Sequence, residues 1–196
     1  MATSTLASDS KKTAAELCAD VDLGKEAREL LTPEDNPRQF VQRLMEHDLL
    51  LDTIRVVARA LSKPVAVRWA CSCAVQASGE RAKVPDASCV AAAERWAAEP
   101  SEENRRAAMA EAATTDYGTP GAWAAAAAGW AGGSLAPPEV PLVPPPDHLT
   151  AHAVAGAVTL AAASDPEQLE TRQIAFLHAA LDLADGRGAI AGGSGS

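Results

Sequence analysis

The sequence predicts an all-α fold, and three observations support that prediction. Apolar residues make up 47% of the chain and are mostly alanine and leucine, whereas aromatic residues make up only 4%. Strands favour β-branched and aromatic residues, so this composition favours helices. Prolines and helix-capping residues stand just before apolar stretches with helical spacing. We expect a compact multi-helix bundle, or a short helical-repeat-like array, of about eight or nine helices with a proline-rich extended strap.

A pair of helices is expected over residues 37–61. Asn36 precedes Pro37, and Gln39 completes the spacing of a capping box, so the first helix starts there rather than at Thr32. The second helix carries apolar residues at helical spacing: Leu50, Ile54, Val57 and Leu61. We place the break between the two helices near residues 47–49.

Similar signals mark the remaining helices. A proline or a capping side chain stands at each expected start, and glycine or proline follows each expected end. The expected starts are Pro64, Asp86 (before residues 87–98), Ser101, Thr119 with Pro120, Asp147, and Asp165 with Pro166. The expected ends are Gly79, Pro100, Gly132 with Gly133, and Gly186. We assign residues 13–187 to a single helical domain.

The strap is expected over residues 132–147, where "APPEVPLVPPPD" holds six prolines within residues 137–146. Proline fixes φ and removes a backbone donor, so the segment should follow an extended polyproline II path. It is either a ligand for a proline-binding groove or a stiff strap whose apolar side chains pack against the helices, and we favour the strap. The candidate partner contacts are Pro138, Pro141 and Pro144, and the side chains expected to pack are Val140, Leu142 and Val143.

The net charge limits the class of partner. The chain carries a formal net charge of −9 and has a pI near 4.9. Such a chain repels nucleic-acid phosphates and anionic lipid, and no compact Lys/Arg cluster offsets the repulsion. The apolar run "AWAAAAAGWAGG" is far shorter than the roughly 20 residues that a bilayer span requires. We expect a protein partner, no nucleic-acid partner and no membrane insertion.

The chain ends and the cysteine content bear on location. Residues 1–12 lack the basic region and apolar run of a secretory signal, and we expect them to form a disordered tail. Residues 188–196 are expected to form a flexible tail that is in part a linker. Four cysteines without a signal peptide indicate free thiols in a reducing compartment, so we expect a cytoplasmic protein.

Two cysteines one residue apart, in "VRWACSCAVQA", are the first candidates for chemistry. On a helix Cys71 and Cys73 lie about 200° apart, so they face opposite ways and share neither a metal ion nor a disulfide. The polar residues of the stretch, Arg68, Ser72 and Gln76, form one narrow stripe, and the remaining circumference is apolar. A helix of this kind lies inside a protein, so we expect both cysteines to be small core residues.

The next candidates are His148 and His152, which lie four residues apart and therefore on one face of a helix, as in a two-histidine metal site. A zinc protease places a glutamate after the first histidine, but Leu149 stands at that position. The sequence offers no obvious third ligand. We therefore predict neither a bound metal nor a cofactor.

Trp123 and Trp130 are candidates for partner contact. They stand seven residues apart on the alanine-rich helix, so they project from one side of it. We favour internal packing for both. The alternative is that one of them is exposed and anchors a partner, because tryptophan is enriched among binding hot spots.

Four blocks of the sequence, in this order, resemble an uncharacterised family of small all-helical bacterial proteins: "LTPEDNPRQFVQRLMEHDLLLDTIRVVARALSKPVAVRWACSCA", "AAAERWAAEPSEENRRAAMAEA", "GAWAAAAAGWAGGSLAPPEVPLVPPP" and "HLTAHAVAGAVTLAAA". The likeness covers most of residues 13–183. Members of that family look like companions of type VI secretion or related contractile-injection gene clusters. The resemblance implies a cytoplasmic adaptor or chaperone for a secreted effector or spike component, and it carries no catalytic residues.

These observations favour a non-enzymatic protein–protein interaction module, in the role of an adaptor or chaperone for a bacterial secretion-system component or effector. The sequence has no G-x-S-x-G elbow, no glycine-rich phosphate loop and no dinucleotide fingerprint, so no catalytic residue is predicted. The alternative is a metal-binding regulator or small enzyme that uses His148 and His152.

Overall fold

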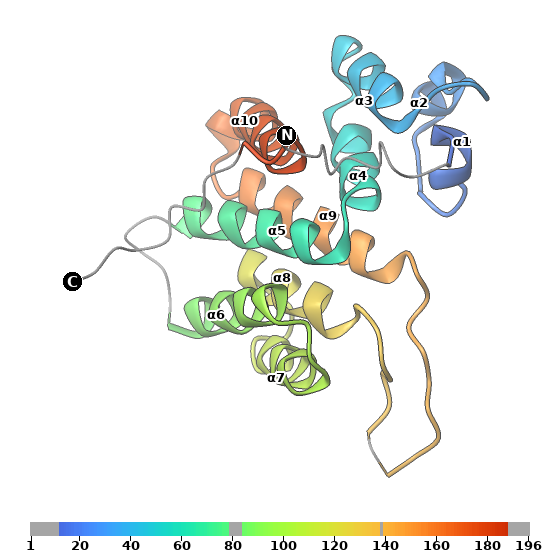
Figure 1. Ribbon diagram of the computed structural model, residues 1–196. Coiled ribbons are helices and arrows are strands. Elements are labelled where there is room, and N and C mark those ends of the chain that lie inside the picture. The colour runs from blue at the N-terminus through green and yellow to red at the C-terminus, as the bar shows by residue number, and fades with distance from the viewer. Residues whose placement is uncertain (1–11, 79–83, 138, 188–196) are drawn as a thin grey trace.

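The computed structural model describes residues 12–78, 84–137 and 139–187, and this part of the chain is all-α, as predicted (Figure 1). It contains ten α-helices, a 3₁₀ turn at Pro166–Gln168 and no strand. The helices are α1 (Ala14–Leu17), α2 (Lys25–Leu30), α3 (Pro37–Glu46), α4 (Leu50–Ala60), α5 (Lys63–Ser78), α6 (Val84–Ala98), α7 (Glu102–Ala113), α8 (Pro120–Gly129), α9 (Leu149–Ala163) and α10 (Leu169–Ala184). The two expected tails, apart from Lys12, and the expected helix end at Gly79 lie outside the described residues.

The helices are arranged in layers, with α5 and α9 in the middle (Figure 1). Helices α6, α7 and α8 lie on one side of this pair, and α3, α4 and α10 lie on the other. The buried apolar side chains of all these layers form one connected core. No helix in the described ranges combines the length and the apolar character that crossing a membrane requires.

Helix α8 occupies a central position because its side chains are small. It packs against α5, α6, α7 and α9, and every residue from Ala124 to Gly129 is buried. A Cβ atom at Gly129 would lie 2.8 Å from Cβ of Met109 on α7, which is closer than such atoms approach in proteins. The alanine-rich sequence therefore sets how closely four neighbouring helices approach one another.

Helix α5 is held in the core by a large side chain. Trp69 is fully buried, and its indole N–H donates a hydrogen bond to the backbone carbonyl of Phe176 on α10 at 2.8 Å. This bond satisfies the polar atom of the indole ring where no water reaches it. It also links the middle layer to α10.

Several predicted helix starts are confirmed. Asn36 and Gln39 form the expected capping box at α3, and the side chains of Ser101 and Thr119 accept hydrogen bonds at the starts of α7 and α8. The break between α3 and α4 falls at residues 47–49 as expected, and Asp48 has the positive φ of 56°.

Other predicted boundaries are wrong or shifted. Asp86 lies inside the first turn of α6 and does not cap it. Its carboxylate instead makes tertiary contacts, since it accepts hydrogen bonds from the Gly121 N–H at 2.9 Å and the Ser78 hydroxyl at 3.1 Å. Asp147 does not cap α9, whose N-cap is His148 with no side-chain cap bond. Asp165 caps the 3₁₀ turn that leads into α10 rather than α10 itself.

Helices α1 and α2 were not predicted from the sequence. They attach to α3 and to the turn before it through polar contacts. The buried carboxylate of Asp35 accepts a hydrogen bond from Nη2 of Arg43 at 2.9 Å, and the same guanidinium donates to the Leu30 carbonyl at 2.7 Å. The Ala14 N–H donates to the Asp35 carbonyl at 2.7 Å. Because these contacts join residues across the turn before α3, they fix both short helices against it.

Acid should weaken this attachment. The hydrogen bond from Arg43 lowers the pKa of Asp35, so the carboxylate stabilises the fold above its unfolded pKa of about 3.9, and the stabilisation is lost as the pH falls through the folded value. The difference in unfolding free energy between wild type and Asp35→Asn should be largest at neutral pH and shrink below about pH 4. Urea denaturation at a series of pH values measures it. Asp22→Asn, at an exposed aspartate that pairs with Arg28, is the matched control, and a pH-independent difference for Asp35→Asn would contradict the assignment.

All four cysteines are buried and free, which confirms the core assignment of Cys71 and Cys73. Burial raises the pKa of Cys18 to about 11 and raises the pKa of the other three thiols above the ordinary value. The thiolate is the reactive form, so both exclusion of reagent and the raised pKa suppress reactivity.

The folded protein should therefore react slowly with Ellman's reagent at pH 8, and denatured protein should release four equivalents rapidly. Val75→Cys is a positive control, because Val75 lies exposed on the same helix as Cys71 and Cys73. A rapid phase from the native wild-type protein would place a cysteine at the surface and overturn the core assignment.

Candidate binding site: a pocket and a projecting arm

A pocket of about 760 Å³ lies between α4 and α9, and we call it the α4–α9 pocket. Leu51, Arg55 and Arg59 recur every fourth residue of α4 and line one wall. His148 and His152 share the face of α9 that lines the opposite wall, in agreement with the four-residue spacing. Local helical periodicity therefore orients both walls, and the packing of α4 against α9 brings them together.

Aromatic side chains form the end of the pocket. The rings of Tyr117, Trp123 and Trp130 contact one another in a triangle with centroid separations of 6.2, 6.1 and 6.1 Å, and the two tryptophans meet edge to face. All three are half-buried, and Tyr117 and Trp123 line the pocket. A Cβ atom at Gly156 would lie 3.3 Å from the indole of Trp123, so the glycine lets that ring lie close against α9. The two tryptophans contact each other beside α8, and both are partly buried against the core.

The backbone that carries Tyr117 is strained. Asp116 and Tyr117 have φ values of 48° and 56°, in the left-handed region that residues other than glycine seldom adopt. Such a conformation costs on the order of 1 kcal/mol for each residue. The contacts of the Tyr117 ring with Trp123 and Trp130 offset this cost and hold the ring at the pocket.

Charged groups also line the pocket. Arg59 donates from Nε and Nη2 to the two carboxylate oxygens of Asp20, at 3.0 and 3.3 Å, and this pairing lowers the pKa of Asp20. The same carboxylate lies 4.0 Å from Nδ1 of His148. Nη1 of Arg55 donates to the Asp22 carbonyl at 2.9 Å, which fixes the segment before α2 as a further wall.

The two histidines do not gather a metal-ligand set. Within the described ranges no three or more His, Cys, Asp or Glu side chains lie together in a group suited to a metal ion. The nearby carboxylate of Asp20 is occupied by Arg59. The pocket combines apolar and aromatic groups with several polar and charged side chains, a combination that suits a binding surface.

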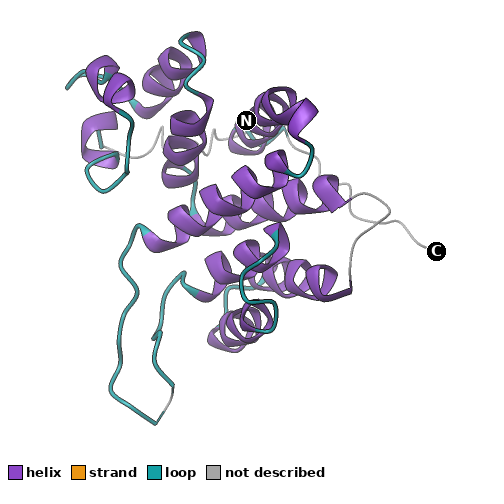
Figure 2. Ribbon diagram, turned by 180° about the vertical axis from the view of Figure 1, so that it is seen from behind, coloured by secondary structure: helices purple, strands orange, loops and turns teal. Residues whose placement is uncertain are grey.

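The proline-rich segment leaves the body at the end of α8 and returns to it at His148, which lines the pocket. We call residues 135–137 and 139–147 the proline arm; Pro138 lies outside the described residues. The arm projects away from the helices in both views (Figures 1 and 2). The expected packing of its apolar side chains against helices is therefore wrong, since Val140, Leu142 and Val143 are 50%, 68% and 49% exposed. Pro141 and Pro144 are exposed as well.

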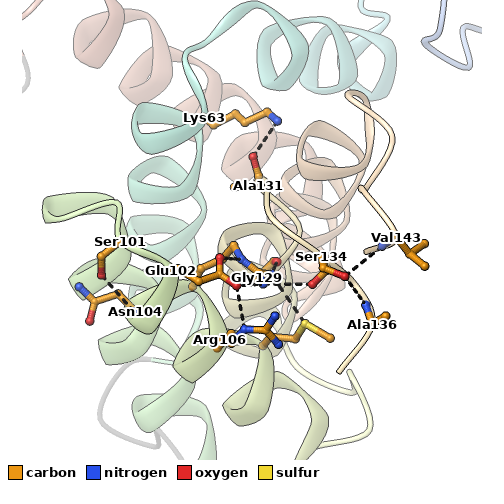
Figure 3. Close-up of polar contacts among 12 residues, drawn as sticks. Lys63, Ser101, Glu102, Asn104, Arg106, Gly129, Ala131, Ser134, Ala136 and Val143 are labelled. Carbon is orange, nitrogen blue, oxygen red and sulfur yellow. Dashed lines mark hydrogen bonds and ion pairs between the residues drawn. The ribbon is translucent and has the colours of Figure 1, made fainter. Parts of the chain in front are cut away.

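The physical reason for the projection lies at the root of the arm. The Ser134 hydroxyl accepts hydrogen bonds from the N–H groups of Ala136 and Val143 at 3.1 and 3.0 Å (Figure 3). The Leu135 N–H also donates to the Val143 carbonyl at 2.8 Å. These bonds tie the outgoing limb to the returning limb, so the apolar side chains between them cannot lie down on the body.

A buried arginine fixes this root to the helices. Arg105 on α7 is 3% exposed, and it donates to the Gly129 carbonyl, to the Ser134 carbonyl at 3.0 Å, and to the Glu102 carboxylate at 2.7 Å. Glu102 also pairs with Arg106, and Lys63 of α5 donates to the Ala131 carbonyl at 2.8 Å (Figure 3). The last carbonyl of α8 and the root of the arm therefore share one donor.

Replacing this donor should destabilise the fold strongly. Arg105→Met leaves the carbonyls of Gly129 and Ser134 buried without their donor, and we expect a loss of about 2–4 kcal/mol in the free energy of unfolding. Arg106→Met removes a partner of the same carboxylate whose side chain is 35% exposed, so it should cost less than about 1 kcal/mol. Urea denaturation compares the two variants. Equal losses would show that the buried hydrogen bonds of Arg105 are not what anchors the arm.

Sequence reasoning found the two histidines, the two tryptophans and the arm, but it missed Arg55, Arg59 and Tyr117. No local pattern marks these three residues, because they join the pocket only through the packing of α4 against α9 and the turn before α8. In the sequence, Arg55 and Arg59 look like ordinary charged residues on a helix surface. The only sequence signal for the turn is the polar stretch between α7 and α8.

The comparisons place the chain in a family. No curated protein and no solved structure matches it. The model of one family, described as a family of unknown function, DUF6931, matches residues 40–184. That range includes α4, α8, α9 and the arm, and it leaves out Asp20 and Asp22 of the pocket. Since the match spans well over half of the sequence, the chain belongs to the DUF6931 family.

Proposed function

We propose that the protein is a non-enzymatic protein–protein interaction module whose α4–α9 pocket receives apolar side chains of a partner protein. The observation that carries this proposal is the convergence of Tyr117, Trp123 and Arg55 on one pocket. Tryptophan, tyrosine and arginine are the residues most enriched among binding hot spots. A hot spot also requires a pocket from which water is excluded when an anchor residue enters, and about 760 Å³ accommodates several side chains.

The pocket is bordered by apolar surface that a partner would cover. Leu51 on α4 and Leu160 on α9 line it and are each 40% exposed. Exposed leucines that surround an aromatic pocket extend the apolar area available to a partner. Arg55 and His152 supply polar groups at the border, as in interfaces with an apolar centre and a polar rim.

We further propose that the role is that of a cytoplasmic adaptor or chaperone for a component or effector of a bacterial secretion system. This part of the proposal is supported by the resemblance of the sequence blocks to companions of contractile-injection gene clusters. A chaperone of this kind needs a surface that shields apolar side chains of its client, and the α4–α9 pocket offers such a surface.

A matched pair of variants tests the proposal. Leu160→Glu introduces a charge at the pocket, whereas Ile174→Glu introduces the same charge on α10, at a side chain of similar exposure (36%) outside the pocket. Both are solvent-accessible positions inside helices, so circular dichroism should show unchanged helicity. In affinity purification from lysate of the source cells, wild type and Ile174→Glu should recover the same partner, and Leu160→Glu should lose it, because a buried unpaired charge costs several kcal/mol.

Recovery of the partner by Leu160→Glu at the wild-type level would place the interface elsewhere on the molecule. A wild-type protein that recovers no partner in stoichiometric amount would contradict the interaction module itself.

A further inference from the structure

The proline arm has the properties of a preformed ligand. It leaves Val140, Leu142 and Val143 without cover, although burial of apolar side chains normally drives folding. Proline locks φ, so a segment with this composition loses little conformational entropy when it is bound. An exposed apolar segment that is already ordered is suited to insertion into a partner surface.

The arm is directed away from the pocket of its own chain. The hydrogen bonds of Ser134 and the pairing of Leu135 with Val143 hold its limbs together at the root, and Arg105 fixes that root to α7 and α8. The returning limb ends at His148, which lines the pocket. The described part of the arm extends away from the helices (Figure 2). Residues 141–146 contain no turn or helix, and extended polyproline geometry over these six residues gives a reach of about 19 Å from the body.

The pocket has the chemistry that recognises such a segment. Polyproline segments bind surfaces lined with aromatic rings, because flat rings contact the proline rings and apolar side chains along the segment. Tyr117 and Trp123 supply such rings, and Leu51 and Leu160 extend the apolar surface on both sides.

Charge adds a second match. Glu139, which is exposed, is the only charged residue between Ala131 and Pro146. In the described part of the chain, Arg55 makes its hydrogen bonds through Nη1, which leaves Nε and Nη2 for another acceptor. Arg55 already pairs with Asp52 through Nη1, and Asp20 and Asp22 also line the pocket, so the match with the arm carboxylate is a local one at Nε and Nη2 of Arg55.

We propose that each copy of the protein inserts its proline arm into the α4–α9 pocket of a second copy, so that two copies form a dimer by reciprocal exchange of arms. The proposal rests on the proposed function, because it takes the same pocket as the protein-binding surface. Two-fold symmetry is the commonest way in which identical chains associate. Reciprocal exchange covers both arms and fills both pockets at once. Once one arm is inserted, the second insertion occurs within the same complex and is favoured by a high effective concentration.

The test uses two variants of the full-length chain that are each defective in one half of the contact. Val140→Ser combined with Leu142→Ser removes apolar side chains of the arm, and Leu160→Glu alters the pocket. Because all three positions are exposed, both proteins should fold normally. Sedimentation velocity should show a wild-type dimer, and each variant alone should dissociate with a Kd raised by about tenfold or more. In an equal mixture, a mixed pair keeps one intact arm in one intact pocket, so mixed dimers should form more readily than dimers of either variant alone and less readily than wild-type dimers.

Two control variants make the pattern specific. Val75→Ser and Ile174→Glu change exposed apolar side chains outside the arm and the pocket, and both should dimerise like wild type. A wild-type protein that stays monomeric overturns the exchange of arms. A dimer that the arm variant leaves unchanged overturns it too, as does a mixture that associates no better than the two variants do separately.

The two proposals fail in different ways. If the wild-type protein is monomeric but Leu160→Glu still abolishes recovery of the lysate partner, the exchange of arms is wrong and the interaction module is supported. If the variants and their mixture dimerise as predicted, but no lysate partner depends on Leu160, the results support arm exchange and contradict an adaptor role for the pocket.

Discussion

The close packing of α8 is the constraint on which the rest of the structure depends. Four helices meet a segment built almost entirely of alanine and glycine, and Gly129 touches α7 so closely that a single added carbon would clash with Met109. Packing at this distance leaves no space for large side chains on the buried faces of α8. The bulky residues of that helix, Trp123 and Trp130, are therefore confined to its one open side, where they meet Tyr117.

The same helix determines where the arm begins. The last carbonyl groups of a helix have no partner within it, so they need donors from elsewhere. At the end of α8 that donor is Arg105, which also holds the Ser134 carbonyl and thereby sets the direction in which the chain leaves the body. The end of α8 thus fixes the root of the arm, and the rings of Tyr117, Trp123 and Trp130 contact one another beside the same helix. A partner that contacts both would meet them in a defined relative orientation.

The sequence predicted well what local chemistry decides. The caps at Asn36, Ser101 and Thr119 depend on bonds between residues three positions apart, and the burial of Cys71 and Cys73 depends on the period of one helix. Prediction failed where distant residues compete for the same group, as at Asp86, whose carboxylate bonds to α8 and Ser78 instead of capping. The capping box of Thr13 and Glu16, which marks α1, follows the same local rule.

The arm shows why an apolar pattern alone does not decide burial. Val140, Leu142 and Val143 were expected to pack because apolar side chains usually do, yet a side chain reaches the core only if the backbone can bring it there. Here the clamp at Ser134 and the stiffness of the prolines prevent that approach. A chain that keeps such a segment exposed carries an aggregation hazard unless something covers it, and the aromatic pocket that begins where the arm ends has the composition to do so. In the proposed exchange of arms, the arm and the pocket are two halves of one contact that two copies close together.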